Sequence, residues 1–154
     1  MTVYFLDSSA LVKRYIAEVG TVWIQALTDA ETGNLLFLAR IAWVEVLSAF
    51  ARRQREGLLN GAEVNELMLA FHAHLNHQYE MVEVDVPLVA MACQLVMQHP
   101  LRAYDAVQLA AALRVQTALG QAEDSTLMFL SADERLLSVA SAMNLATDNP
   151  NQHP

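Results

Sequence analysis

Residues 3–15 of this 154-residue chain read VYFLDSSALVKRY, an apolar run that ends at an acidic residue and leads directly into a helix-forming stretch. The four apolar residues predict a short buried strand, and Ser8 or Ser9 predicts the capped start of a helix over 8–18. Asp7 is thereby expected at the C-terminal end of a strand. A strand followed at once by a helix is the first unit of an α/β fold.

The same alternation continues along the rest of the chain. Further short apolar runs predict strands at 35–38, 81–84 and 127–130. Helical spacing predicts helices at 21–28, 41–56, 60–78, 87–98, 102–116 and 132–143. This order predicts a three-layer α/β fold in which a parallel sheet is covered by helices on both faces. We expect one domain over residues 1–147 and a flexible polar tail over 148–154.

Composition excludes several classes of protein. Hydrophobic residues make up 55% of the chain and charged residues 17%, which excludes intrinsic disorder outside the tail. Charged residues interrupt every long apolar run, so no membrane span is expected. The first residues lack the pattern of a signal peptide, and Cys93, expected to be buried, is the only cysteine. We therefore expect a cytoplasmic protein.

Four carboxylates are predicted to meet at one edge of the sheet. Asp7 and Asp133 each follow a predicted strand, and Glu45 and Asp105 lie near the starts of helices among apolar residues. In a parallel α/β fold, functional groups gather beyond the C-terminal ends of the strands. An unpaired carboxylate in apolar surroundings is costly, which favours a shared site over four unrelated acids.

Each carboxylate also has a structural explanation. Asp7 can cap the helix that follows it, and Ser131 with Glu134 fits a capping box that would leave Asp133 as an acid of the first helical turn. Asp105 can pair with Arg102, and Glu45 with an arginine. Asp124 is a possible substitute for Asp133, although it is expected at the opposite edge of the sheet.

Clustered carboxylates need either protons or a bound cation. Two carboxylates about 4 Å apart repel each other by about 4 kcal/mol at an effective dielectric constant near 20. Oxygen ligands without Cys or His favour Mg²⁺ or Mn²⁺ over zinc. A divalent ion held by carboxylates and water is typical of phosphodiester hydrolysis. The hydroxyls of Ser8, Ser9 and Ser131 are candidates to support these acids.

Four segments give the chain a specific resemblance. YFLDSSALVKRY, ARIAWVEVLSAFARRQREG, LRAYDAVQLAAAL and FLSADERLLSVA occur in this order over nearly the whole length. The chain resembles the PIN-domain nucleases, and particularly the VapC-like toxins of toxin-antitoxin systems. The resemblance implies that Asp7, Glu45, Asp105 and Asp133 form an acidic metal site. It also implies a parallel sheet of about five strands.

The resemblance further implies a biochemical activity and its partners. They are Mg²⁺- or Mn²⁺-dependent endoribonuclease activity, an RNA substrate, a homodimer and a cognate antitoxin protein. The charged residues allow an RNA-binding groove only locally, because the net charge is −8, with 9 basic against 17 acidic side chains. We expect Lys13, Arg14 and Arg52 to flank that groove.

Three other interpretations remain open from the residues alone. A noncatalytic Mg²⁺-binding regulatory module would use Asp7 but leaves Glu45 and Asp105 unexplained. A degenerate PIN scaffold would have lost metal binding, although all four acids are present. A phosphatase with an aspartyl nucleophile would usually have a second Asp two residues later, where this chain has Ser9.

A zinc site on His74 and His77 has no third ligand nearby.

Overall fold

The computed structural model, which describes residues 2–120 and 126–154, contains a five-stranded, fully parallel sheet at its centre. The strands run in the order β3-β2-β1-β4-β5. They are β1 (Val3–Leu6), β2 (Leu35–Ala39), β3 (Tyr79–Val82), β4 (Leu127–Leu130) and β5 (Ala146–Asp148). The chain leaves β1 in one direction for β2 and β3 and returns past it to β4 and β5. The direction of winding therefore changes between β1 and β4, and ligands bind beside such a point in open α/β sheets.

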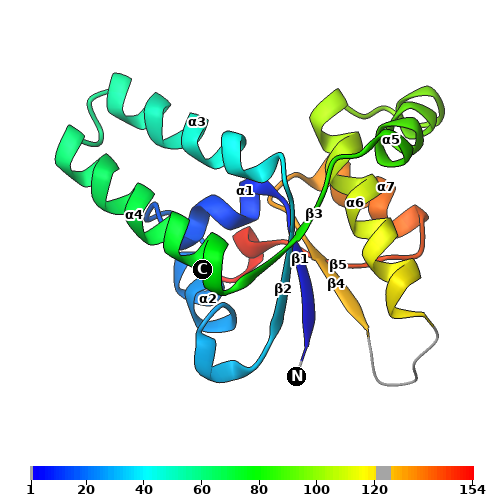
Figure 1. Cartoon of the computed structure of the whole chain (residues 1–154), viewed down its shortest axis with the longest axis horizontal. Helices are drawn as coiled ribbons and strands as arrows, with labels where there is room; N and C mark the ends of the chain where they lie inside the picture. The colour runs from blue at the N-terminus through cyan, green and yellow to red at the C-terminus, as the bar shows by residue number, and fades with distance from the viewer. Residues whose placement is uncertain (1, 121–125) are drawn as a thin grey trace.

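Helices cover both faces of the sheet, as the sequence predicts (Figure 1). One face carries α1 (Ser8–Leu11), α2 (Thr21–Leu27), α3 (Ala42–Arg55) and α4 (Gly61–His77). The other face carries α5 (Val86–Gln98), α6 (Ala103–Leu119) and α7 (Glu134–Ala142). Short 3-10 turns lie at η1 (Val12–Arg14), η2 (Ala30–Thr32) and η3 (Pro150–Gln152). The three-layer α/β prediction is confirmed.

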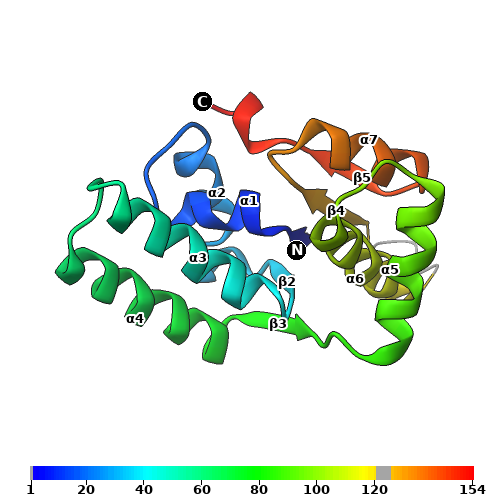
Figure 2. The ribbon, with the colours of Figure 1, turned by 90° about the horizontal axis from the view of Figure 1, so that it is seen from above.

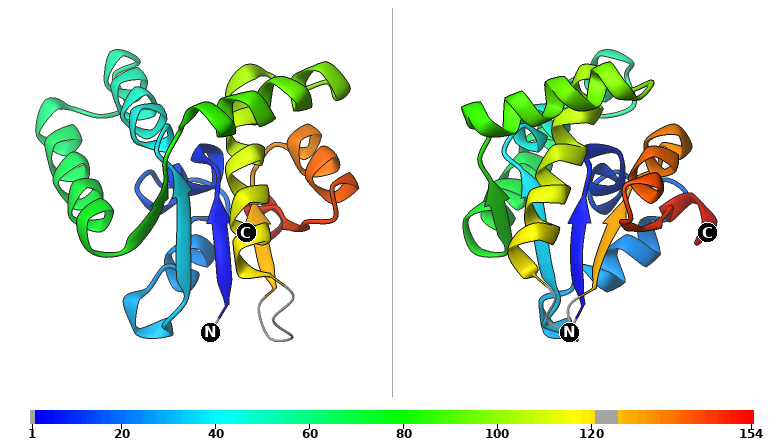
Figure 3. Two further views of the ribbon diagram at one scale, coloured as in Figure 1. Left: turned by 45° about the vertical axis from the view of Figure 1, so that its right-hand side comes forward. Right: turned by 90° about the vertical axis from the view of Figure 1, so that its right-hand side faces the viewer.

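Each face of the sheet has its own apolar core. On the α5–α7 side, Phe5 and Phe129 of adjacent strands are fully buried, with ring centroids 5.8 Å apart. On the α1–α4 side, the fully buried rings of Phe50 and Phe71 join α3 to α4. These cores hold α3 and α6 against opposite faces of the sheet. Both helices begin at the end toward which the strands point (Figure 3).

Two elements differ from their predicted positions. The predicted helix over 8–18 is a single α-turn followed by η1. The third strand lies at Tyr79–Val82 rather than 81–84, because its backbone pairs with β2 from Leu36 to Ala39. The residues beyond Val82 therefore lie outside the sheet.

The residues predicted to form a flexible tail are packed on the domain. Asp148 ends β5, and Asn149 is buried and donates a hydrogen bond from Nδ2 to Oε1 of Glu134 at 2.6 Å. The His153 ring stacks on Trp23 of α2 at a centroid distance of 3.9 Å. The chain end thus lies beside α2 (Figure 2). The predicted boundary at residue 147 is wrong, because short polar residues that suggest a tail also form strand ends and caps.

Two further expectations have different outcomes. Cys93 is exposed on α5 rather than buried, because its neighbours Ala92 and Leu95 occupy the face of α5 that meets the core. Within residues 2–120 and 126–154, none of the helices has the length and apolar character that a membrane span requires.

The C-terminal packing predicts a specific sensitivity at Gly20. This residue has φ +88°, and a Cβ atom there would overlap the carbonyl oxygen of Pro150. We expect Gly20→Ala to lower the free energy of unfolding by more than about 2 kcal/mol, measured by urea denaturation. Gly33→Ala is the matched control, because Gly33 has φ +69° but no atom within 4 Å of an added Cβ. Equal losses in both variants would contradict the packing of the C-terminal segment.

Candidate active site

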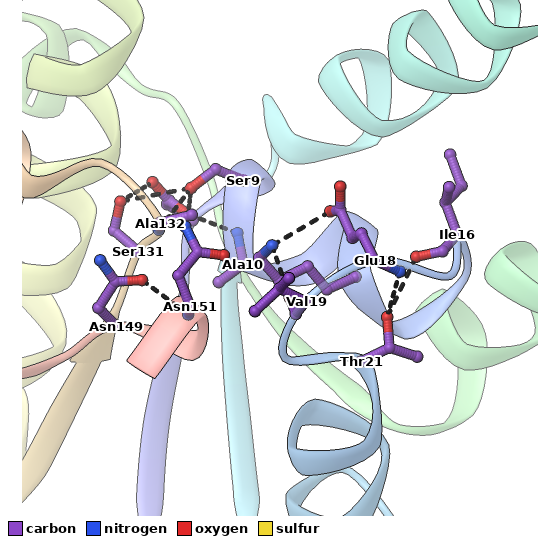
Figure 4. Close-up of polar contacts among 12 residues, drawn as sticks. Ser9, Ala10, Ile16, Glu18, Val19, Thr21, Ser131, Ala132, Asn149 and Asn151 are labelled. Carbon is purple, nitrogen blue, oxygen red and sulfur yellow. Dashed lines mark hydrogen bonds and ion pairs between the residues drawn. The ribbon is translucent and has the colours of Figure 1, made fainter. Parts of the chain in front are cut away.

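Asp7 lies at the junction of β1 and α1 and is 4% exposed. Its Oδ1 accepts hydrogen bonds from the backbone N–H of Ala10 at 2.9 Å and from Ser9 Oγ at 2.7 Å. Its Oδ2 accepts a hydrogen bond from Ser131 Oγ at 2.6 Å. Asp7 is therefore the cap of α1, in place of the predicted Ser8 or Ser9, and the same contacts fix its carboxylate at the end of the sheet. Figure 4 shows its donors Ser9, Ala10 and Ser131 close to one another.

Glu45 reaches the same region from the first turn of α3. Its Oε1 accepts a hydrogen bond from Gln108 Nε2 at 2.7 Å, and its Oε2 accepts one from Ser8 Oγ at 3.0 Å. The donors belong to α6 and α1, on opposite faces of the sheet. Two separate layers therefore hold this side chain in position, and the arginine partner considered for Glu45 is replaced by an amide and a hydroxyl.

Asp105 is half-buried in the first turn of α6. Within the described part of the chain, its carboxylate has neither a hydrogen-bond donor nor an ion-pair partner. The predicted pairing with Arg102 is wrong as a contact, although the positive charges of Arg102 and Arg135 act on Asp105 from farther away. Asp105 is therefore a partly exposed carboxylate that the described residues leave open to a ligand or to water.

Asp133 is the cap of α7, because its Oδ1 accepts from the backbone N–H of Arg135 at 2.9 Å and of Leu136 at 3.4 Å. The predicted capping box of Ser131 and Glu134 is wrong. Ser131 Oγ instead donates to Asp7, and Glu134 accepts from Asn149 on the C-terminal segment. Asp133 therefore lies one position before the helix rather than inside its first turn.

The four carboxylates line one cavity of about 500 Å³, together with Ser8, Ser9, Val12, Val44, Ser48, Ala49, Arg52, Arg102 and Tyr104. We call this the acidic cavity. It lies where Asp7 and Asp133 follow the neighbouring strands β1 and β4. The fold thus brings together the acids predicted from the sequence, while Asp124, the possible substitute, lies outside the described residues.

The pKa values of three acids of the cavity, Asp7, Glu45 and Asp105, are raised. Burial raises the pKa of Asp7 to about 6, although its hydrogen bonds from Ser131, Ser9 and Ala10 act in the opposite direction. Burial also raises the pKa of Glu45, against the hydrogen bond from Gln108. The pKa of Asp105 is raised by burial and then by the negative charge of Asp133. A bound cation would relieve this shared cost of charge.

The residues present fit a hard divalent cation. Carboxylate and hydroxyl oxygens line the cavity, and among the described residues no donor occupies either oxygen of Asp105. In the conformation described for residues 2–120 and 126–154, no three Asp, Glu, His or Cys side chains lie close enough together to hold an ion. Binding a metal directly by several carboxylates would therefore need small side-chain movements, or water between the ion and some of the acids.

Two of the three cations predicted to flank an RNA-binding groove have structural partners instead. Lys13 is 4% exposed, donates to the carbonyl of Val19 at 2.9 Å and lies 3.4 Å from a carboxylate oxygen of Glu18. Arg14 donates to Gln78 Oε1 at 2.8 Å and to Tyr79 Oη at 2.6 Å. Both side chains hold the fold together around η1. Arg52 does line the acidic cavity, where it is joined by Arg102.

The histidines of α4 have structural contacts. His72 Nε2 accepts a hydrogen bond from Trp43 Nε1 at 3.1 Å, and His74 Nδ1 lies 2.8 Å from the hydroxyl of Tyr15. Burial lowers the pKa of His74. Among the described residues these histidines join no metal-binding group.

Gln108 is the part of the site that the sequence analysis missed. It is 1% exposed in the Ala-rich helix α6, one turn after Asp105, and its amide donates to Glu45. Its Oε1 is buried without a hydrogen-bond partner among the described residues. An amide at this position in an otherwise apolar helical face was the available signal, because a buried polar side chain normally has a specific partner.

Comparison with known proteins agrees with this architecture. A family model described as PIN domain matches residues 4–142. No curated protein matches the chain at a significant level of sequence similarity.

Three solved structures have a similar fold. They are VapBC2 from Rickettsia felis bound to a DNA fragment from its promoter (TM-score 0.66, 10% identity, covering 96% of this chain and 98% of that one), FitAcB from Neisseria gonorrhoeae (0.61, 19%, 96% and 97%) and PAE2754 from Pyrobaculum aerophilum (0.64, 17%, 98% and 91%). At sequence identities of 10–19%, these similarities show a shared fold and nothing more.

The buried Asp7 predicts an unusual dependence of stability on pH. Its folded-state pKa of about 6 exceeds the ordinary aspartate pKa of 3.8, so the folded state holds the proton more tightly. Stability from this group is complete below pH about 4 and is lost as the pH rises through about 6, which amounts to about 3 kcal/mol. We expect Asp7→Asn to remove this loss. The free energy of unfolding is measured by urea denaturation at pH values from 4 to about 7, with EDTA present.

Asp29→Asn, which changes an exposed cap in η2, is the matched control and should behave as the wild type. If Asp7→Asn kept the wild-type loss of stability over this pH range, the buried charge would not be its source.

Proposed function

Because the chain belongs to the PIN domain family, we propose that it is a metal-dependent endoribonuclease that hydrolyses RNA phosphodiester bonds as the toxin of a toxin-antitoxin pair. The observation that supports this most directly is the meeting of Asp7, Glu45, Asp105 and Asp133 on one cavity from distant parts of the chain. The alternative of a noncatalytic regulatory module gives no role to Glu45 and Asp105, which α3 and α6 bring to the same place.

The residues divide naturally into holding and orienting roles. Asp7 and Asp105 are the proposed direct ligands of Mg²⁺ or Mn²⁺, and Glu45 and Asp133 the residues that bind it through water or orient the attacking water. When bound, the ion supplies a water of lowered pKa and stabilises charge on the phosphate. Ser131 and Ser9 fix the Asp7 carboxylate, while Gln108 and Ser8 fix that of Glu45.

The proposed partners follow from the similar structures. The resemblance of the sequence to VapC-like toxins, together with the similar folds of VapBC2 and FitAcB, supports a cognate antitoxin for this chain. A homodimer is also proposed, and the exposed side of α4, which includes Leu69 at 72% exposure, is a candidate surface for either contact. A cytoplasmic location would place the protein with its RNA substrate.

The first test is metal-dependent cleavage. Total cellular RNA incubated with the purified protein in Mg²⁺ or Mn²⁺ should gain discrete 5′ ends, read by sequencing, which are absent with EDTA. Asp105→Asn should reduce their formation by at least about 100-fold, because it removes a proposed direct ligand rather than a supporting contact. Glu66→Gln, an exposed acid on α4, is the control. Identical ends from the wild type and Asp105→Asn would contradict the proposed activity.

A second test separates the two roles of Asp133. Asparagine caps helices about as well as aspartate, so Asp133→Asn should change the free energy of unfolding by less than about 0.5 kcal/mol. Its RNA cleavage should nevertheless fall by about 10- to 100-fold, because it loses the charge proposed to act on the metal through water. Asp133→Ala, which also loses the cap, should unfold more easily by about 1 kcal/mol. Wild-type cleavage by Asp133→Asn would restrict Asp133 to capping.

A further inference from the structure

Gln108 is a buried amide in an apolar stretch of α6. It is 1% exposed, and its neighbours Ala106 and residues 109–112 are buried and apolar. Within residues 2–120 and 126–154, its Oε1 is the only buried side-chain oxygen or nitrogen atom without a hydrogen-bond partner. An unsatisfied buried acceptor costs free energy that an apolar side chain of similar shape would avoid. Packing alone therefore does not explain an amide at this position.

The amide turns its donor toward Glu45. Nε2 of Gln108 lies 2.7 Å from Oε1 of Glu45, and a reversed amide would instead bring two acceptor oxygens together. Ser8 Oγ donates to the other carboxylate oxygen at 3.0 Å. Each oxygen of Glu45 thus has one donor, and the two donors stabilise the negative charge that would otherwise attract a cation. They fix Glu45 in position and at the same time weaken it as a metal ligand.

Asp105 receives the opposite treatment on the same helix. It lies one turn before Gln108 on α6, and neither of its oxygens has a donor among the described residues. In the described part of the chain, no three acids lie close enough together to hold an ion. The contacts of Glu45 account for its part in this separation, because Gln108 and Ser8 hold it from α6 and α1. The two acids are therefore prepared for different tasks.

We propose that Gln108 is a positioning residue that, together with Ser8, keeps Glu45 from direct contact with the bound divalent ion and leaves its carboxylate to orient water. This inference rests on the proposed ribonuclease function and decides which of the acids touch the ion. A side chain that only supported a metal ligand would strengthen metal binding, and its loss would weaken it. Gln108 has the opposite sign, because its hydrogen bond competes with the ion for Glu45.

Binding of Mn²⁺ without RNA tests this sign. Mn²⁺ is titrated into the protein, and the free ion is followed by electron paramagnetic resonance. Gln108→Met keeps the length of the side chain and loses the donor. It should bind Mn²⁺ about three- to tenfold more tightly than the wild type, because Glu45 is released toward the ion. Weaker binding by Gln108→Met would overturn the inference.

Gln116→Met is the matched control for this substitution. Gln116 lies about two turns further along α6, its Nε2 donates to the backbone oxygen of Asn144, and it does not line the acidic cavity. Its Mn²⁺ affinity should equal that of the wild type. A gain in Gln116→Met as large as that in Gln108→Met would assign the effect to α6 in general and contradict the role of Gln108.

RNA cleavage gives the second readout. Gln108→Met should lower kcat by about 10- to 100-fold with KM within about twofold of the wild type, because Glu45 is no longer held for water. In a Glu45→Gln background, Gln108→Met should change neither kcat nor Mn²⁺ affinity, since it acts through Glu45. Equal effects in both backgrounds would refute the positioning role.

Ser8→Ala repeats the test outside the core. Ser8 is only half-buried, and the substitution removes the donor to the second oxygen of Glu45 while leaving Gln108 in place. It should also tighten Mn²⁺ binding and lower kcat. This variant decides the question if Gln108→Met does not fold.

The outcomes separate this inference from the proposed function. If the wild type cleaves RNA and both Gln108→Met and Ser8→Ala keep its Mn²⁺ affinity and kcat, the positioning role is refuted and the ribonuclease stands. If the wild type binds Mn²⁺ but cleaves no RNA, the ribonuclease function fails, and the Mn²⁺ affinities still decide whether Gln108 holds Glu45 off the ion. If the wild type binds no Mn²⁺, the inference fails.

Discussion

The hydrogen bond from Ser131 to Asp7 joins the two strands between which the sheet changes its direction of winding. Ser131 is fully buried, and its hydroxyl also accepts the backbone N–H of Asp133. Ser9 adds a second link, because it donates to Asp7 and accepts the backbone N–H of Ala132. One buried carboxylate therefore joins the loops after β1 and β4, and Asp133 lies on the second of these loops, where its backbone N–H bonds to Ser131.

The hydrogen bonds fix the positions of the carboxylates, but burial makes their charged forms less favourable. Three donors satisfy the oxygens of Asp7, yet burial still raises its pKa, because hydrogen bonds from neutral groups do not fully replace water around a charge. Gln108 and Ser8 likewise donate hydrogen bonds to Glu45, and burial still raises its pKa. Uncharged donors hold Asp7 and Glu45 in place, whereas Asp105 has no donor among residues 2–120 and 126–154. Such an imbalance is typical of a site that awaits a cation.

The position of the acids could be predicted from the sequence because it follows from a general property of parallel sheets. Asp7 comes directly after β1 and Asp133 follows shortly after the end of β4, and the ends of parallel strands share one edge. Which side chains would hold them could not be predicted in full, since Gln108 and Glu45 are 63 residues apart and meet only through packing of α3 and α6 across the sheet. Lys13 and Arg14 were misassigned for the same reason: a basic pair in sequence does not reveal which way its side chains point.

The arginines at the cavity connect the charge of the protein to the charge of its proposed substrate. Arg102 counteracts the raised pKa of Asp105 without touching it. A phosphate bound to Arg102 would neutralise that influence and increase the cost of the negative charge on Asp105. A cation among the carboxylates would offset this cost. Binding of a phosphate and binding of a divalent ion are therefore expected to favour each other, so that the acidic cavity is most stable when metal and RNA are present together.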